Sequence, residues 1–145
     1  RVVVGSTVGG PDRFTPSCAT STAPDRSYMW TAPISGDFFI DTFGSTYDTM
    51  LTLHTSCTGP ELPGMCNDDV PGMGTESRLR VTLRAGARVL IVVDGWASSS
   101  GSFVLNISRA FPNETGLCSD GLDNDGDLAI DCADSDCAMD TACTP

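Results

Sequence analysis

The sequence contains no lysine, only one histidine and no long apolar segment, and each of these shortages excludes a class of function. Its eight basic residues are all arginines, set against nineteen acidic residues, for a formal net charge of −11. Nucleic acids and anionic membrane surfaces both require clustered basic side chains, so neither partner is expected. The longest apolar run, residues 89–93, is far too short to span a bilayer, so we expect no membrane insertion.

Cysteine, in contrast, is abundant and indicates where the protein resides. Seven cysteines in 145 residues are typical of an oxidising, extracytoplasmic compartment. A zinc site is not expected, because there is no Cys-x-x-Cys pair and only one histidine. The chain opens at Arg1 without Met or a hydrophobic leader, as expected of an exported protein whose signal peptide has been removed. We therefore expect an extracellular or cell-surface protein.

The pairing of these cysteines can be predicted only in part. Cys57 and Cys66 flank a stretch rich in Gly and Pro, as two strand ends joined by a turn would, and we predict that they pair. The four C-terminal cysteines admit three connectivities: Cys118, Cys132, Cys137 and Cys143. Cys18 then remains as a buried free thiol, a bridge to one of these four, or an intermolecular link.

Most of the chain has the pattern of an antiparallel β-sandwich. Stretches rich in β-branched and aromatic residues recur between clusters of Gly, Pro, Ser and Asp. They cover residues 2–4, 27–32, 37–42, 48–54, 78–83, 89–94 and 102–107. Residues 78–83 alternate between apolar and polar, which predicts a strand with one buried face, whereas residues 89–93 predict a central strand covered on both faces. No segment shows a sustained helical period. We predict an all-β, jelly-roll-like sandwich over residues 1–110.

Residues 118–145 differ sharply in composition and follow a short linker at residues 111–117. They combine eight aspartates with four cysteines and contain no basic residue. Carboxylates this close repel one another unless a cation lies between them, and calcium takes roughly six to eight oxygen ligands in irregular geometry. The alternative is a solvated, disordered acidic tail. The interleaved cysteines argue against that alternative, so we predict a disulfide-stapled calcium-binding module.

The spacing of these aspartates resembles a twelve-residue calcium loop that begins at Asp123. The predicted ligands are Asp123, Asp125, Asp127, the carbonyl of Ala129, Asp131 and Asp134, with Asp120, Asn124 and Asp136 in reserve. Leu128 stands where such a loop has glycine, and Asp134 stands where it has a bidentate glutamate. Because no amphipathic helix flanks the segment, we expect a helix-free aspartate loop rather than an EF-hand.

A second group of acidic and amide side chains follows the predicted strand ends within the sandwich. It comprises Asp41, Asp48, Asn67, Asp68 and Asp69. If these strand ends meet, the side chains converge on a second calcium ion at one end of the sandwich. The alternative is turn chemistry, because Asp and Asn also stabilise turns through hydrogen bonds to their own backbone.

An ordered series of short motifs resembles the bacterial pre-peptidase C-terminal domain. The motifs are SYMWTAP at 27–33, GDFFIDTFGS at 36–45, YDTMLTL at 47–53, CNDD at 66–69, SRL at 77–79 and VVDG at 92–95. The resemblance covers residues 2–108 and implies a jelly-roll-like, non-catalytic module of exported proteins. Such modules serve secretion, matrix or substrate binding and stabilisation, often with bound calcium. Residues 120–127 are similar to the Cys-rich aspartate repeat of bacterial surface proteins and to thrombospondin type 3 repeats.

Motifs for catalysis are missing. His54 is the only histidine, and there is no Gly-x-Ser-x-Gly elbow, His-Glu-x-x-His motif or phosphate-binding loop. Paired carboxylates of the kind that glycosidases use are plentiful. They cluster in loops that calcium binding explains better, so we expect that the protein is not an enzyme.

Two classes of function remain. In the first, the chain is a self-assembling subunit of a bacterial surface filament or layer, and Val2, Val3 and Val4 add to a neighbour's sheet edge. These valines can instead form the first strand of their own sheet. In the second, the chain is an adhesion module of a larger secreted protein that recognises protein matrix or polysaccharide. Trp96 is then a candidate contact with the ligand, or it folds over the end of the sandwich. No ligand pocket can be inferred from the sequence, which favours the first class.

Overall fold

The computed structural model describes residues 2–144, so Arg1, at the start of the predicted leading segment, lies outside the described residues. The chain divides into two compact units, residues 1–108 and residues 109–145, and each is described by itself. The segment expected to be a linker, residues 111–117, belongs to the second unit. Its Glu114 is fully buried there, which explains why these residues fold with the module that follows them.

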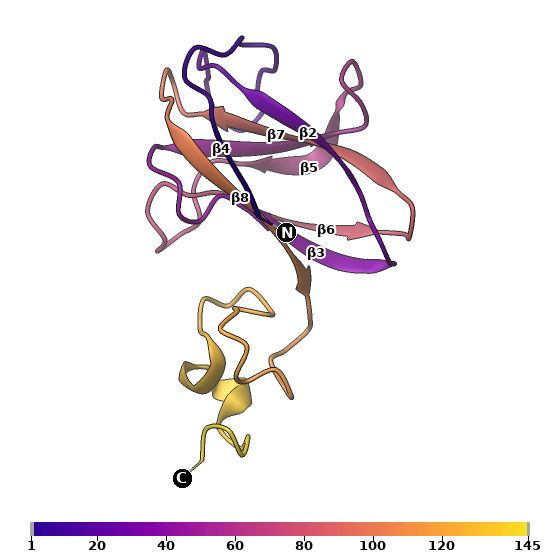
Figure 1. Ribbon diagram of the computed structural model, residues 1–145, viewed down its shortest axis with the longest axis vertical. Coiled ribbons are helices and arrows are strands. Elements are labelled where there is room, and N and C mark those ends of the chain that lie inside the picture. The colour runs from indigo at the N-terminus through magenta and orange to yellow at the C-terminus, as the bar shows by residue number, and fades with distance from the viewer. Residues whose placement is uncertain (1, 145) are drawn as a thin grey trace. The chain divides into compact units, whose positions relative to one another are not determined.

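The first unit is an all-β sandwich of two four-stranded sheets, as predicted (Figure 1). In spatial order, one sheet contains β1 (Val2–Ser6), β8 (Ser102–Ala110), β3 (Gly36–Asp41) and β6 (Arg78–Leu83). The other contains β2 (Arg26–Thr31), β7 (Arg88–Gly95), β4 (Thr49–His54) and β5 (Glu61–Asn67). The pairs β1–β8, β3–β6, β2–β7, β4–β7 and β4–β5 are antiparallel.

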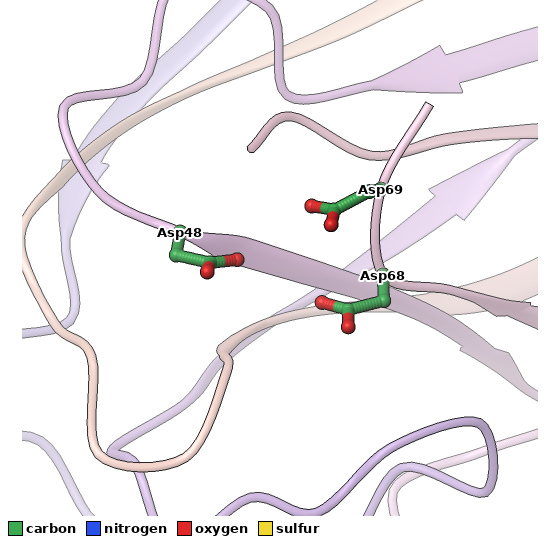
Figure 2. Close-up of side chains that lie close together, drawn as sticks. All are labelled: Asp48, Asp68 and Asp69. Carbon is green, nitrogen blue, oxygen red and sulfur yellow. The ribbon is translucent and has the colours of Figure 1, made fainter. Parts of the chain in front are cut away.

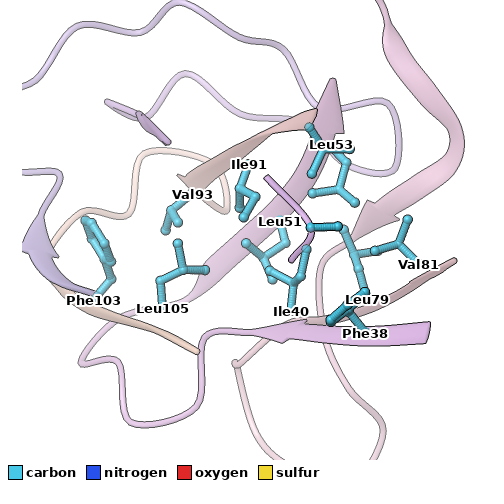
Figure 3. Close-up of a cluster of buried hydrophobic side chains, with 12 residues drawn as sticks. Phe38, Ile40, Leu51, Leu53, Leu79, Val81, Ile91, Val93, Phe103 and Leu105 are labelled. Atoms are coloured by element: carbon cyan, nitrogen blue, oxygen red, sulfur yellow. The ribbon is translucent and has the colours of Figure 1, made fainter. Parts of the chain in front are cut away.

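The core lies between the two sheets and follows the alternation of each strand. Buried apolar side chains from β3, β6 and β8 face those of β4 and β7 (Figure 3). On β6, Leu79 and Val81 are buried while Arg80 and Thr82 are exposed, as the alternating pattern predicted. From Val89 onward β7 is buried on both faces, which fits its place between β2 and β4. Burial of this apolar surface is the main force that stabilises the sandwich.

The second face of the β2–β7–β4–β5 sheet is also covered, which explains why every residue of β4 is buried. The segment between β1 and β2 crosses this face. The Phe14 ring lies against His54, with 4.9 Å between ring centroids, and the Ser21 hydroxyl donates to Asp94 at 2.8 Å. A disulfide from Cys18 then fastens the segment to edge strand β5. The lone histidine is therefore a buried structural residue.

The predicted bond between Cys57 and Cys66 is wrong. Cys66 pairs with Cys18 across 48 residues, and Cys57 is an exposed free thiol in the turn after β4. Cys18 is therefore neither free nor intermolecular, contrary to each alternative considered for it. The error arises because sequence spacing does not reveal that the β1–β2 segment crosses the sheet and reaches β5.

Strand β5 itself was not predicted. It contains Pro63 and Gly64, residues that are typical of turns. It lies at the edge of its sheet, where proline is tolerated because one side of the strand needs no hydrogen-bond donors, and its register against β4 shifts between Thr52 and His54.

The second unit consists of loops and two short 3₁₀ turns, η1 (Asp131–Ala133) and η2 (Ser135–Cys137). Two disulfides, Cys118–Cys137 and Cys132–Cys143, select one of the three connectivities that the sequence left open. A unit this small buries little apolar surface, so the disulfides supply much of its stability. Among residues 2–144 there is no helix with the length and hydropathy needed to cross a membrane.

Candidate metal sites

The first candidate metal site lies at one end of the sandwich and is formed by three aspartates. Asp48 directly precedes β4, and Asp68 and Asp69 directly follow β5. Because β4 and β5 are antiparallel, with Leu51 opposite Asn67, the start of one strand meets the end of the other. The three carboxylates point toward one another, with one oxygen of each within 4.8 Å of the others (Figure 2).

The electrostatics of this group are those of a site that a cation could occupy. Oδ1 of Asp48 and Oδ1 of Asp68 are both buried, and no donor in the described part of the chain bonds to either. Loss of water raises the pKa of both carboxyls, and the charge of Asp69 raises the pKa of each further. A divalent ion would coordinate the two unbonded Oδ1 atoms and remove the repulsion between the three carboxylates. The residues present therefore fit a metal ion.

The other two members of the predicted set lie outside this group and position the chain instead. Asp41 Oδ1 accepts hydrogen bonds from the Phe43 amide at 3.1 Å and from Asn106 Nδ2 at 2.8 Å. Asn67 Oδ1 accepts from the Arg78 amide at 2.9 Å, and its Nδ2 donates to the Asp69 carbonyl at 3.3 Å. Asn67 thereby holds the turn that carries two of the grouped aspartates. The sequence pattern does not separate these roles, because Asp and Asn serve both.

The second unit brings aspartates together in two overlapping groups. One contains Asp123, Asp125 and Asp127, and the other contains Asp125, Asp134 and Asp136, each with oxygens within 4.8 Å of one another. The first three follow alternate positions of a tight turn, in which Asp123 Oδ1 accepts from the Gly126 amide at 2.8 Å. The turn passes through Leu128 with φ of 75°, the left-handed conformation that glycine adopts at lower cost.

Asp134 is the most informative member of these groups. It is only 3% exposed, and its Oδ2 has no hydrogen-bond partner among the described residues. Its Oδ1 accepts from the Asp136 amide at 2.6 Å, which orients both residues at the start of η2. Burial raises the pKa of Asp125, with Coulombic contributions from Asp127, Asp134 and Asp123. These features again fit a cation between the carboxylates.

The remaining residues of the predicted loop have other partners. Asp131 accepts hydrogen bonds from the amides of Asp120 and Gly121 at 3.1 Å each, and Asp120 accepts from Leu122 and Asn124. Asp131 lies at φ of 50° and points back over the loop. Ala129 donates its amide to Asp127 Oδ1 at 2.8 Å. The geometry thus departs from the twelve-residue arrangement, although its aspartates supply both groups.

Glu114 organises the second unit and was not identified from the sequence. Its side chain is fully buried; Oε1 accepts from the Asn124 amide and Oε2 from the Asp131 amide, both at 2.8 Å. It therefore joins the two ends of the aspartate loop. A single acid among Pro, Asn and Thr carries no periodic or spacing signal, so only the folded structure reveals this role.

The two other candidate features are Trp96 and the valines of strand β1. Trp96 is 48% exposed, and its amide donates to the Asp48 carbonyl at 3.0 Å, so its loop is anchored beside the first aspartate group. Strand β1 pairs with β8 at an edge of its own sheet, and Val4 is 71% exposed. Val3 packs partly against the core, and the Val2 side chain lies outside the described residues.

Comparison with solved structures finds similar folds, although no family model and no curated protein match the sequence. The structure is similar to the crystal structure of the pre-peptidase C-terminal domain of a collagenase from Bacillus anthracis, with a TM-score of 0.49 and 12% sequence identity. The match covers 74% of this chain and 88% of that domain.

Proposed function

We propose that this chain is a non-catalytic, calcium-stabilised structural module of the extracellular space. The observation that carries the proposal is that three of the four buried carboxylate oxygens without hydrogen-bond partners in the described chain, Asp48 Oδ1, Asp68 Oδ1 and Asp134 Oδ2, lie within groups of three aspartates, whereas the fourth, Asp94 Oδ2, does not. A buried, unpaired carboxylate is costly, so a protein that clusters several of them needs a compensating cation.

Calcium fits these groups better than other cations. Every candidate ligand is a carboxylate, which disfavours the softer metals that prefer thiolate or imidazole. Magnesium demands nearly ideal octahedral geometry, whereas calcium tolerates the irregular positions that loops provide. Three aspartates supply only part of the roughly six to eight oxygens that calcium takes, so backbone carbonyls and water complete the shell. The three disulfides agree with an oxidising, extracellular setting.

Within this function we propose that the chain assembles with copies of itself, as a subunit of a bacterial surface filament or layer. Two surface features support the proposal. Strand β1 is an edge strand with an exposed Val4, and an unprotected edge is a template for pairing with another chain. The exposed thiol of Cys57 is available for a disulfide between copies, which was one of the three alternatives considered for Cys18.

The second candidate is an adhesion module of a larger secreted protein that recognises matrix protein or polysaccharide. The observation in its favour is the exposed Trp96 ring, whose loop is bonded to Asp48. An exposed indole provides a stacking surface for sugars or partner side chains.

Negative-stain electron microscopy of the purified chain distinguishes the two candidates. Ordered fibres or sheets in calcium that fray in excess chelator are expected for the self-assembling subunit. Dispersed single particles in both conditions would reject self-assembly and favour the adhesion module. In the second case a Trp96→Ala variant should lose binding to matrix or polysaccharide.

A further inference from the structure

A pocket of about 300 Å³ opens where the segment after β1 meets strand β2, away from the aspartate groups in sequence. Its lining residues are Pro11, Arg13, Asp25, Arg26 and Ser27. Two of the eight arginines of a strongly acidic protein therefore line one small cavity. Its volume lies at the lower end of the range for small-molecule sites, roughly 300–1,000 Å³.

Neighbouring backbone holds the Arg26 side chain in place, whereas Arg13 is exposed and only its backbone is fixed. Asp25 is only 3% exposed, and its Oδ2 accepts from the amides of Arg13 at 2.5 Å and Phe14 at 2.9 Å, which fixes the start of the Arg13 side chain. Arg26 Nη1 donates to the Asp25 carbonyl at 3.3 Å. The Arg26 guanidinium lies against Gly10, where a Cβ would collide with Nη1. Glycine at position 10 thus leaves room for this placement.

The two arginines of the pocket, Arg13 and Arg26, make no ion pair with a carboxylate of the described chain, residues 2–144. Asp25 is the only acidic residue among those that line this pocket, and its Oδ2 already accepts two amide hydrogens. Two guanidinium groups therefore line the pocket beside a carboxylate whose Oδ2 is already bonded, and each guanidinium can pair with a carboxylate of a ligand.

We infer that this pocket binds a single carboxylate carried by a sugar-sized polar ligand, a hexuronic acid residue. Guanidinium groups pair with carboxylates through two parallel hydrogen bonds, which selects this anion by geometry as well as charge. Pro11 offers an apolar wall for the sugar ring, and Ser27 offers a hydroxyl for its polar edge. The overall charge of −11 repels densely charged polyanions at long range, so a ligand with one charge per binding unit is favoured.

Titration with D-glucuronate, followed by isothermal calorimetry and by NMR shifts of residues 10–14 and 25–27, tests this inference. Saturable binding to the intact chain is expected, together with at least a tenfold loss of affinity in Arg13→Gln and in Arg26→Gln. Arg84→Gln, which makes the same charge change at an exposed turn residue, should bind as the wild type does. Glucose, which lacks the carboxylate, should not bind.

Gly10→Ala provides a test that leaves both charges in place. The added methyl group collides with the flexible end of Arg26 and lies 3.0 Å from the Thr7 carbonyl oxygen, so affinity should fall strongly while the melting temperature falls only slightly. If Arg26→Gln does not fold, Arg26→Lys keeps the charge but loses the paired geometry and should also bind more weakly. The inference is overturned if glucuronate causes no saturable shift, if Arg84→Gln loses affinity equally, or if acetate binds as tightly as glucuronate.

Discussion

Asp48 and Asp68 each bury an Oδ1 atom that no described residue bonds, although they come from segments separated by a complete hairpin. Their carboxylates lie within 4.8 Å of one another and of Asp69. In the absence of a cation this arrangement combines desolvation with like-charge repulsion, and both effects oppose folding. A bound cation or a proton would remove this cost.

Asp68→Asn should have opposite effects with and without calcium. In calcium the variant loses a charged ligand and should unfold at a lower temperature than the wild type. In excess chelator it loses a repulsive charge and should be as stable as the wild type or more stable. Thermal unfolding in both buffers measures this, with Asp12→Asn as a control that removes a charge outside the groups. Equal destabilisation in both buffers would show that Asp68 has only a structural role.

Glu114→Gln should lower the stability of the second unit. The amide that replaces one carboxylate oxygen is a donor, and it would face the amide hydrogen of Asn124 or Asp131. Loss of one such buried bond costs about 2 kcal/mol. Faster amide exchange across residues 118–144, together with weaker calcium binding there, is the expected result. Glu76→Gln makes the same chemical change in the sandwich and should leave that exchange unaltered.

Replacing the paired cysteines and replacing the free cysteine should have very different effects on the stability of the sandwich. Removal of the Cys18–Cys66 bond in a Cys18→Ser/Cys66→Ser variant should destabilise the sandwich by about 4 kcal/mol, as expected for a loop of 48 residues. Cys57→Ser should leave the melting temperature unchanged, because that thiol is exposed and unpaired. It should also remove any disulfide-linked dimer seen without reductant. A large loss of stability in Cys57→Ser would instead indicate the pairing first expected from the sequence.

The stability of the sandwich should depend on Asp94 at mildly acidic pH. Burial raises the pKa of Asp94 to about 6, against the opposing hydrogen bonds from Gly95 and Ser21, and the charges of Asp25 and Asp12 raise the pKa further. Between pH 4 and 6 the folded state holds a proton that the unfolded state has lost. The contribution of Asp94 to the free energy of unfolding therefore falls by up to about 3 kcal/mol as the pH rises through this window. Above pH 6 this contribution no longer changes with pH.

Urea unfolding in chelator at pH 4.5, 6 and 7.5 measures this dependence, because chelator removes the competing effect of calcium. In Asp94→Asn the decline between pH 4.5 and 6 should be clearly smaller than in the wild type. An identical decline in both proteins would place the titration on other carboxyls.

The sequence predicts most of the fold but less of the sites. Seven strands were found because their apolar residues alternate or run continuously, a local signal. The edge strand β5 was missed because Pro63 and Gly64 carry the stronger local signal of a turn. The Cys18–Cys66 bond depends on a segment crossing a sheet face, which no local pattern encodes.

For the candidate sites, the sequence identified the kind of residue but not its role. Asp48, Asp68 and Asp69 converge as expected, whereas Asp41 and Asn67, of similar chemistry, bond to backbone and side-chain amides. In the second unit Asp131 was expected as a ligand and instead holds backbone amides. Roles of this kind depend on which oxygen remains without a donor after folding, and only the three-dimensional structure determines that.

Scanning calorimetry of the intact chain, in saturating calcium and in excess chelator at neutral pH, measures whether calcium stabilises this fold. Calcium at about a hundred times its dissociation constant stabilises a single site by about 2.7 kcal/mol, which raises the melting temperature of a chain this size by roughly 5–10 °C. We predict a rise of at least this size, because there is more than one aspartate group, and magnesium at the same concentration should give less. Superimposable melting curves with and without calcium would show that the aspartate groups do not bind a stabilising calcium ion.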